Sequence, residues 1–310
     1  MQIIQYPEKE QWAQITERPH LDVSQLNATV AGVLADVKQH GDAAVKTYEQ
    51  KFDHVELGSL AVSEAEMKEA EAEVSNSLKE AITLAHHNIR VFHESQRFEG
   101  RKIETQPGVT CWQKSVAIQR VGLYIPGGTA PLFSTVLMLA TPAKIAGCEE
   151  IVLCTPPGKD GKVNPAILMA AKIAGVSKIF KAGGVQAIGA MAYGTESVPK
   201  VYKIFGPGNQ YVMAAKQQVS LHDVAIDMPA GPSEVCVIAD QDADVTFVAA
   251  DLLSQAEHGT DSQVILITDS EKIIKTVQDE VAVQLEALPR KEIAVKSLDN
   301  SKFVLVHDLD

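Results

Sequence analysis

Hydrophobic positions in the first hundred residues recur three or four apart, which is the spacing of helices with one buried face. Ser24 and Asp42 are suitable N-cap residues for two such helices, and Gly41 between them is a suitable stop. Ser63 and Glu66 form a capping-box pattern at the start of a longer helical region. The pattern therefore predicts helices over 24–41 and 42–51 and a helical region over 63–96 that breaks near 75–77.

The pattern changes after about residue 103, where short apolar runs begin to alternate with glycine- or proline-containing turns and helical segments. Such alternation predicts right-handed crossovers and a mainly parallel sheet. The run from Glu234 to Ala239 is typical of a short buried strand. Residues 1–19 show no clear period, and we expect them to form a polar arm. The predicted strands are 109–113, 116–125, 151–154, 179–180, 201–205, 224–227, 234–239, 264–268 and 303–306.

Composition narrows the class of protein. Of the 310 residues, 45% are hydrophobic, which is enough for one large domain or two moderate ones. The formal net charge of -12 and the scattered Lys and Arg residues argue against a nucleic-acid partner. No apolar run is long enough to cross a membrane, and the N-terminus lacks the features of a signal peptide. Four dispersed cysteines, without a Cys-x-x-Cys motif, predict buried thiols in the reducing cytoplasm.

Three glycine-containing turns follow predicted strands, at 124–129, 183–189 and 206–211. The carboxyl ends of parallel strands meet at one edge of an open α/β sheet, where ligands bind. Glycine lets backbone N–H groups approach an anion, and the next helix N-terminus adds a favourable dipole. Any one of these turns is more typical of an ordinary connection. In the third turn, Tyr211 replaces the small residue of the dinucleotide fingerprint, although Asp227 follows at about the expected distance. The three turns together favour a nucleotide cleft.

Polar side chains after residue 230 are candidates for binding a ligand or a metal. Gln255 and His258 are three residues apart, so they project from one face of the last turn of a helix capped by Asp244. Compensation of the helix dipole is an alternative role for His258, and glutamine is an uncommon metal ligand, so the spacing alone does not favour a metal site. Ser233 lies in a rigid Pro/Gly turn, where it could contact a substrate or serve as a structural cap. Cys154 could act as a nucleophile, but the favoured interpretation is a buried small hydrophobic residue.

Six longer motifs follow one another in a fixed order along the chain. They are Gly-Leu-Tyr-Ile-Pro-Gly-Gly-Thr-Ala-Pro-Leu from Gly122, Gly-Gly-Val-Gln-Ala-Ile from Gly183, Thr-Glu-Ser-Val-Pro-Lys-Val from Thr195, Phe-Gly-Pro-Gly-Asn from Phe205, Ile-Asp-Met-Pro-Ala-Gly-Pro-Ser-Glu from Ile226 and Asp-Leu-Leu-Ser-Gln-Ala-Glu-His-Gly from Asp251. This combination closely resembles the histidinol dehydrogenase family, and the resemblance covers about residues 20–310. The resemblance implies oxidation of L-histidinol through the aldehyde to L-histidine, in the last steps of histidine biosynthesis, with two hydrides passing in succession to two NAD.

The resemblance also implies roles for individual residues. The family's NAD-contacting tyrosine, glutamine and asparagine match Tyr124, Gln186 and Asn209. Its substrate-contacting residues match Ser233, Gln255 and His258, and the last two of these also match zinc ligands. In this family the zinc holds the imidazole and amino group of the substrate, which is the role of a Lewis-acid template. The resemblance further implies a homodimer with one zinc per site and a small-molecule substrate, with no nucleic-acid or membrane partner.

The fold class implied by the resemblance is α/β, with two Rossmann-like parallel-sheet domains, one inserted in the other, in an aldehyde dehydrogenase-like architecture with a helical N-terminal region. We place an N-terminal arm at 1–19, the first domain at 20–123 plus 233–310, and the inserted domain at 124–232. The family's acid/base Glu-His pair and two further zinc ligands lie beyond residue 310, so we expect this chain to fold without turning over substrate. Two other hypotheses are a non-catalytic nucleotide-binding module and an aldehyde dehydrogenase that uses Cys154.

Overall fold

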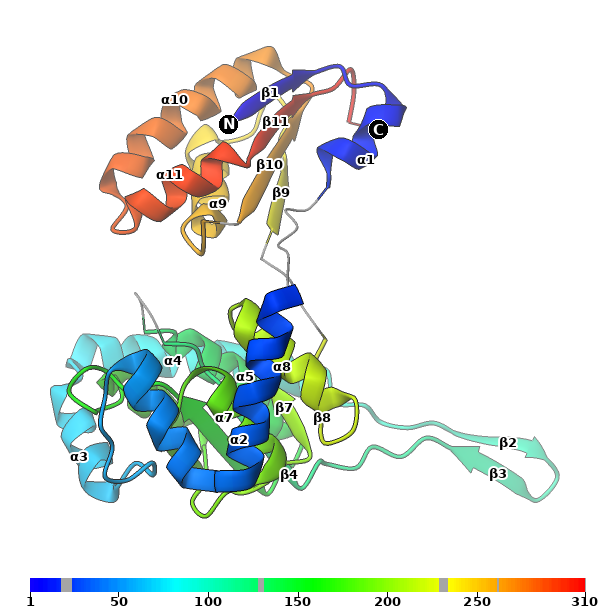
Figure 1. Ribbon diagram of the computed structural model, residues 1–310. Coiled ribbons are helices and arrows are strands. Elements are labelled where there is room, and N and C mark those ends of the chain that lie inside the picture. Colours follow the sequence, from blue (N-terminus) through cyan, green and yellow to red (C-terminus); the bar gives the residue numbers. More distant parts are fainter. Residues whose placement is uncertain (18–23, 128–130, 229–233, 261, 310) are drawn as a thin grey trace. The chain divides into compact units, whose positions relative to one another are not determined.

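The computed structural model describes residues 1–17, 24–127, 131–228, 234–260 and 262–309, and Figure 1 shows its elements. Contacts between residues divide the chain into two compact units. Unit 1 consists of Met1–Asp22 and Ala230–Asp310, and unit 2 is the intervening Val23–Pro229. In sequence, unit 2 is therefore inserted into unit 1. Each unit contains a parallel sheet, and the α/β fold class predicted from the sequence is confirmed.

Unit 2 is built on a five-stranded parallel sheet with the strand order β6-β5-β4-β7-β8. Its strands are β4 (Arg120–Tyr124), β5 (Glu150–Thr155), β6 (Lys178–Lys181), β7 (Lys203–Phe205) and β8 (Ala225–Ile226). The chain moves from β4 to one side of the sheet and then returns to continue on the other side. A doubly wound sheet of this kind leaves a crevice beside the carboxyl end of its first strand.

Helices cover both faces of this sheet. Three of them, α2, α7 and α8, share a core with residues of one strand face such as Val152 and Ile204. On the other face, α3 to α6 enclose Leu123 and Leu153. Because both faces are covered, the strands are continuous apolar runs, which made them visible in the sequence. The bounds are α2 (Ser24–Tyr48), the π-helical turn η2 (Glu49–Asp53), α3 (Glu64–Glu73), α4 (Asn76–Glu94), α5 (Phe133–Ile145), α6 (Pro165–Ala174), α7 (Gly184–Tyr193) and α8 (Gln210–Ser220).

Local sequence signals set the ends of these helices. Gly41 has a φ of 55° and interrupts α2 at the point where the two predicted helices meet. Ser63 and Glu66 form the predicted capping box of α3. The predicted break in the third helical region is confirmed, because α3 ends at Glu73 and Ser75 caps α4.

Unit 1 contains a four-stranded parallel sheet with the order β1-β11-β10-β9. Its three longest helices pack around a core that includes Leu252, Leu266 and Phe303, on one face of this sheet. The elements are β1 (Gln2–Gln5), η1 (Lys9–Gln11), α1 (Trp12–Ile15), β9 (Glu234–Ile238), α9 (Val245–Ala256), β10 (Gln263–Thr268), α10 (Glu271–Ala287), α11 (Lys291–Asp299) and β11 (Lys302–Leu305). Within the described ranges, no helix combines the length and the apolar character that crossing a membrane requires.

Two expectations about unit 1 are corrected by the structure, and one helix was missed. The N-terminal residues form β1, which pairs with β11, instead of a polar arm, and its Gln-Ile-Ile-Gln sequence is too short to show a period. The strand β9 is not buried, because it lies at the other edge of the sheet and exposes alternate residues, including Cys236 and Ile238. The helix α11 was not predicted from the sequence.

The two units also differ from the predicted domains. The sequence-based boundaries join 20–123 to 233–310, but α2 packs against α7 and α8 of unit 2. The helices α3 and α4 likewise pack against α5 and α6 of the same unit. The sequence reveals the apolar face of each helix but not the sheet that covers it, so the boundary falls at residue 23 and not at 124.

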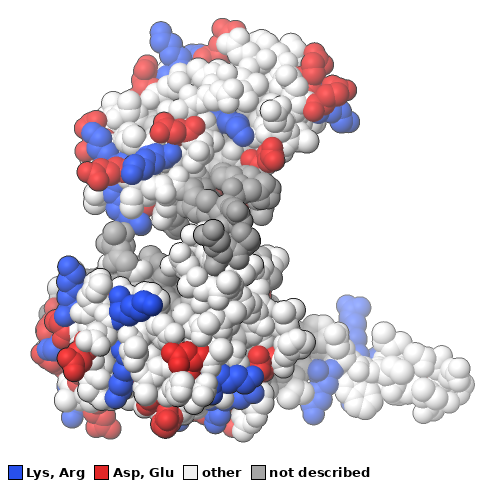
Figure 2. Space-filling view, viewed as in Figure 1, with Lys and Arg blue, Asp and Glu red and all other residues white. Residues whose placement is uncertain are grey.

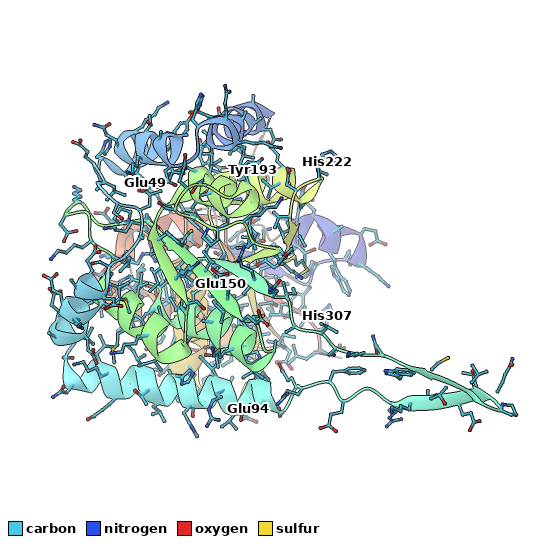
Figure 3. The ribbon with its side chains drawn as sticks, turned by 90° about the horizontal axis from the view of Figure 1, so that it is seen from below. Glu49, Glu94, Glu150, Tyr193, His222 and His307 are labelled. Carbon is cyan, nitrogen blue, oxygen red and sulfur yellow. The ribbon has the colours of Figure 1, made fainter. Side chains whose placement is uncertain are left out.

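A two-stranded antiparallel hairpin projects from unit 2 between α4 and β4, as Figures 1 and 3 show. Its strands are β2 (Lys102–Gln106) and β3 (Val109–Trp112), and every residue of both is exposed. Residues 97–116, which include this hairpin, are termed the arm from here on; they are distinct from the N-terminal arm expected at 1–19. Cys111 is exposed here, so the expectation of four buried thiols is wrong for this residue as well as for Cys236. The exposed large apolar residues of the arm are Phe98, Ile103, Val109, Trp112 and Val116.

Candidate functional site

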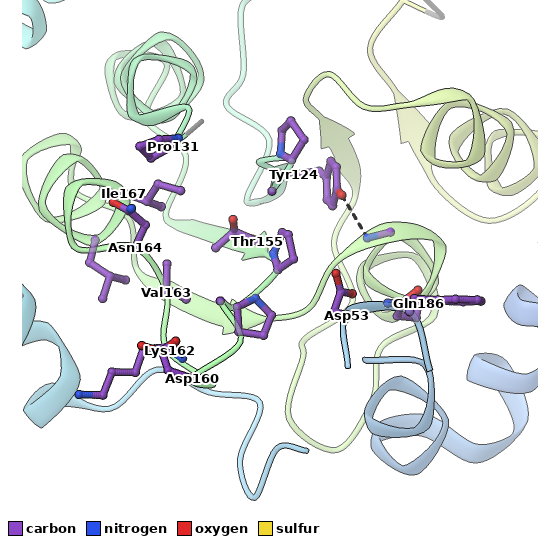
Figure 4. A pocket seen from close by; sticks show the side chains of 18 of the residues that line it. Asp53, Tyr124, Pro131, Thr155, Asp160, Lys162, Val163, Asn164, Ile167 and Gln186 are labelled. Carbon is purple, nitrogen blue, oxygen red and sulfur yellow. Dashed lines mark hydrogen bonds between the residues drawn. The ribbon is translucent and has the colours of Figure 1, made fainter. Parts of the chain in front are cut away.

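A cavity of about 1040 Å³ lies at the carboxyl edge of the unit 2 sheet, and Figure 4 shows it from close by. The turns that follow four neighbouring strands all contribute to its lining. The lining includes Tyr124 at the end of β4, Pro156 after β5, Gly184 after β6 and Asn209 after β7. The predicted meeting of the three glycine-containing turns at one sheet edge is therefore confirmed. Part of the first turn, residues 128–130, lies outside the described residues.

Tyr124 ends β4 and directs its hydroxyl group toward the first turn of α7 (Figure 4). The side chain is buried, and its oxygen accepts a hydrogen bond of 3.1 Å from the N–H of Gly184. Burial raises the pKa of Tyr124 above its ordinary value. The phenol is therefore neutral, and it keeps its own hydrogen for donation to a ligand in the cavity.

Gln186 lies in the first turn of α7 and is 1% exposed. Its Nε2 donates a hydrogen bond of 2.8 Å to Oε1 of Glu49, which also accepts one of 2.7 Å from the N–H of Gly183. The other amide atom of Gln186, Oε1, is buried and has no hydrogen-bond partner within the described part of the chain. Since buried polar atoms normally have a partner, this oxygen is placed to accept a hydrogen bond from a ligand.

Glu49 and Asp53 are site residues that the sequence did not reveal. Glu49 follows α2 and is fully buried, and burial raises its pKa to about 7. The hydrogen bonds from Gly183 and Gln186 act in the opposite direction, while the charge of Asp53 adds to the rise. Asp53 lines the cavity, and burial raises its pKa as well. A glutamate at the end of an amphipathic helix is usually exposed, so only its packing under α7 identifies it.

Asn209 caps α8 and also lines the cavity. Its Oδ1 accepts hydrogen bonds from the N–H groups of Tyr211 and Val212, at 3.0 and 3.1 Å. The cap occupies the amide oxygen only. The side-chain NH₂ of this exposed residue can therefore donate to a ligand.

Asp227 supports the third glycine turn instead of facing a ligand. Its Oδ2 accepts a hydrogen bond of 2.8 Å from the N–H of Gly206, and its other oxygen pairs with the buried Lys216. Lys216 also donates to the carbonyl oxygen of Gly206 at 2.7 Å. The φ of Gly206 is 131°, and an added Cβ would lie 2.1 Å from the carbonyl oxygen of Tyr124. The position therefore requires glycine, and Asp227, which is not among the residues lining the cavity, is not placed as a ribose-binding acid.

Cys154 is inaccessible to any ligand. The side chain is fully buried in the unit 2 core, and burial raises the pKa of its thiol. A cysteine nucleophile acts as the thiolate, which these surroundings disfavour. The hypothesis of an aldehyde dehydrogenase that uses Cys154 is therefore contradicted, and the interpretation as a buried small hydrophobic residue is confirmed.

Gln255 and His258 lie together at the end of α9 in unit 1. The N–H of His258 donates a hydrogen bond of 3.1 Å to the carbonyl oxygen of Gln255. Nε2 of Gln255 is buried and, among the described residues, has no hydrogen-bond partner, whereas His258 is exposed. Ser233, the third residue expected to contact the substrate, lies outside the described residues.

The donors at the end of α9 fit part of a zinc site. Imidazole is a common zinc ligand and a glutamine amide oxygen an uncommon one, and zinc takes four ligands in a structural site. Across the described ranges, no group of three or more His, Cys, Asp and Glu side chains is arranged to hold a metal ion. The two side chains would fill at most two positions of such a shell, and their role as zinc ligands stays a prediction. Their predicted approach to the glycine turns would join residues of both units, and it stays a prediction.

Comparison with known proteins bears on the resemblance drawn from the six motifs. The family model for histidinol dehydrogenase matches residues 16–310. The histidinol dehydrogenase of Bacteroides thetaiotaomicron is 67% identical over 310 residues, which are all of this chain and 72% of that relative. The chain belongs to the histidinol dehydrogenase family.

Further histidinol dehydrogenases agree with this assignment. The enzyme of Xanthomonas euvesicatoria pv. vesicatoria is 55% identical over 288 residues, 93% of this chain and 67% of that relative. The crystal structure of histidinol dehydrogenase from Elizabethkingia anophelis matches with a TM-score of 0.96 and 51% identity, over 99% of this chain and 71% of that one. The recognition of an oxidoreductase family from sequence motifs is confirmed.

Three of the six histidinol dehydrogenase motifs lie far apart in sequence but contribute residues to one cavity of unit 2. Tyr124, Gln186 and Asn209 follow three different strands, and all three line the same cavity. The parallel order of the sheet brings them together, because it places the carboxyl ends of those strands at one edge.

Proposed function

We propose that this member of the histidinol dehydrogenase family binds NAD in the unit 2 cavity and oxidises L-histidinol through its aldehyde to L-histidine, passing two hydrides in succession to two NAD. The observation that carries the proposal is the convergence of Tyr124, Gln186 and Asn209 on one cavity. Each offers a different contact: a neutral hydroxyl, a buried amide oxygen without a partner, and an amide NH₂ beside a helix N-terminus. At about 1040 Å³ the cavity has the volume of a large cofactor site.

Zinc and the substrate belong to the other end of the proposed site. Gln255 and His258 would hold the zinc, and Ser233 would contact L-histidinol. When bound, the zinc orients the substrate by taking its imidazole and amino nitrogens as ligands. Nε2 of Gln255 has no hydrogen-bond partner among the described residues, so no hydrogen bond of that atom holds the amide group away from a zinc ion.

A polypeptide of these 310 residues alone should bind NAD without turning over histidinol. By resemblance, this polypeptide contains two of the zinc ligands and no counterpart of the family's acid/base Glu-His pair. Glu257 and His258 are adjacent, but His258 is assigned to zinc. Oxidation of an alcohol to a carbonyl group releases a proton, so the reaction lacks its general base.

The test combines binding with turnover. NAD is titrated by calorimetry, because Trp12 and Trp112 are not among the residues that line the cavity and tryptophan fluorescence would be a poor reporter. Tyr124→Phe, which removes the hydroxyl donor, should weaken binding about tenfold, the value of one hydrogen bond. NADH absorbance is then followed with L-histidinol, NAD and zinc. Absence of NAD binding would contradict the assignment of the site, and sustained NADH production at the rate of an intact enzyme would contradict the expected inactivity.

A non-catalytic nucleotide-binding module is the second candidate function. The described residues that line the cavity all belong to unit 2, and such a module would bind its nucleotide there. Dialysis against zinc with and without L-histidinol separates the two candidates. Zinc retained only with histidinol favours the enzyme, whereas NAD binding with no such retention favours the module.

We also propose that two copies of the chain associate through the arm. A two-stranded hairpin is marginally stable alone, and this one exposes large apolar residues such as Ile103 and Trp112. Figure 2 shows Lys and Arg atoms on the arm. The arm has four basic and two acidic residues in a chain whose net charge is -12, so a second copy presents a surface of opposite charge.

The remaining partners are proposed to be small molecules. On the face seen in Figure 2, acidic and basic side chains are interspersed, which supports neither a nucleic-acid nor a membrane surface there. All four cysteines are free thiols, as expected in a reducing compartment, and we place the protein in the cytoplasm.

A further inference from the structure

The wall of the dinucleotide cavity contains a pair of carboxyl groups to which neither the six motifs nor the assigned contacts give a role. Glu49 and Asp53 begin and end the single helical turn η2. Glu49 is fully buried, and Asp53, which is half-buried, faces the cavity beside the first turn of α7 (Figure 4).

Among the described residues, no basic side chain acts on the pKa of Glu49. Asp53 from the same turn, Tyr124 from β4 and Cys154 from β5 face Glu49. Burial raises the pKa of Asp53, and the neighbouring His54 acts in the opposite direction. A buried carboxylate without a cationic partner is unfavourable, so these surroundings favour the protonated form of Glu49.

The two oxygens of Glu49 have different surroundings. Oε1 accepts the hydrogen bonds from the N–H of Gly183 and from Nε2 of Gln186. Oε2 is buried and receives no hydrogen bond from any donor in the described residues. A proton on Oε2 removes the cost of this bare oxygen, and the carboxylate of Asp53 accepts the resulting O–H.

We propose that Glu49 is a positioning residue of the dinucleotide site and shares one proton with Asp53. Its Oε1 fixes the Gly183 amide and the side chain of Gln186, and the shared proton holds the pair at a single negative charge. The inference rests on the proposed binding of NAD in this cavity.

The shared proton couples NAD binding to pH. The pyrophosphate of NAD is negative, so a second negative charge on the cavity wall opposes binding. Glu49 loses its proton as the pH rises through about 7. The affinity for NAD is therefore highest below this pH and falls above it.

The test is NAD affinity measured by calorimetry from pH 6 to pH 9. The unmodified protein should lose about tenfold in affinity over this range, within the usual size of coupling between two sites. In Glu49→Gln the carboxamide places an N–H where the shared proton lies, so the pH dependence should disappear. Asp53→Asn removes the charge that raises the pKa of Glu49 and adds an NH₂ donor that favours the Glu49 carboxylate, so the midpoint should move to lower pH.

The matched control is Glu94→Gln, at the end of α4, which should keep the profile of the unmodified protein (Figure 3). Glu49→Ala loses both hydrogen bonds, so it should bind NAD more weakly at every pH. A pH profile unchanged in Glu49→Gln would overturn the inference while leaving NAD binding intact. No NAD binding by the unmodified protein at any pH would overturn the proposed function and, with it, this inference.

Discussion

At the scale of single residues, Glu49 shows how packing can reverse what a sequence suggests. Its neighbours in sequence include Tyr48, Gln50 and Lys51, and nothing in this context marks it as buried. The side chain lies under α7, where Gly183 and Gln186 donate to it. Its protonation therefore depends on a helix more than a hundred residues away in the chain.

The raised pKa of Glu49 makes stability depend on pH. The carboxyl group titrates near its ordinary value of 4.5 in the unfolded chain and near 7 in the folded one. The folded state binds more protons between these values, so the free energy of unfolding falls as the pH rises through this window. Glu49→Gln removes the titration. Its stability relative to the unmodified protein should rise by about 3 kcal/mol between pH 4 and pH 8.

Urea unfolding at the two pH values measures this difference, with Glu94→Gln as the control for loss of an exposed carboxylate. Glu94 is exposed and pairs only with Arg90 of its own helix among the described residues. The effect of Glu94→Gln on the free energy of unfolding should therefore be the same at both pH values. If Glu49→Gln changed the free energy of unfolding by the same amount at pH 4 and at pH 8, burial of an ionisable Glu49 would be contradicted.

At the scale of elements, the first turn of α8 combines a structural role with a binding role. Asn209→Ser keeps an N-cap oxygen but removes the amide NH₂, so the free energy of unfolding should stay within about 0.5 kcal/mol while NAD affinity falls about tenfold. Asn209→Ala loses the cap as well and should cost about 1 kcal/mol of stability. Urea unfolding and calorimetry measure the two effects separately. Full NAD affinity in Asn209→Ser would leave Asn209 with the cap as its only role.

At the scale of the whole molecule, the arm is the element through which we expect two copies to associate. Replacing Ile103 and Trp112 together by Ser removes two exposed apolar side chains, at 59% and 60% exposure, without disturbing a core. Light scattering after size-exclusion chromatography should show a dimer for the unmodified protein and a monomer for the double variant. Phe247→Ser, at an equally exposed position of α9, should leave the dimer intact. A monomeric unmodified protein, or a dimer that survives the double replacement, would contradict this role of the arm.

Much of unit 2 could be predicted from the sequence because its signals act within a few residues. Ser75 and Asn164 cap the helices that follow them, and Gly41 interrupts α2 because its positive φ is not helical. Strands covered on both faces appear as apolar runs, and their carboxyl ends placed the glycine turns at one edge. The cavity residues Tyr124 and Asn209 followed from motifs that occupy those turns.

The sequence by itself determined most helix ends and the buried strands of unit 2, the family and the contents of the glycine turns, since each depends on residues adjacent in the chain. Only the tertiary structure decided that the N-terminal residues pair with β11, that β9 is an exposed edge, that α2 belongs to unit 2 and that Glu49 is buried. Pairing and burial depend on which surface another segment offers, often a hundred or more residues away. An apolar stripe or a lone carboxylate looks the same in the sequence whichever partner it meets.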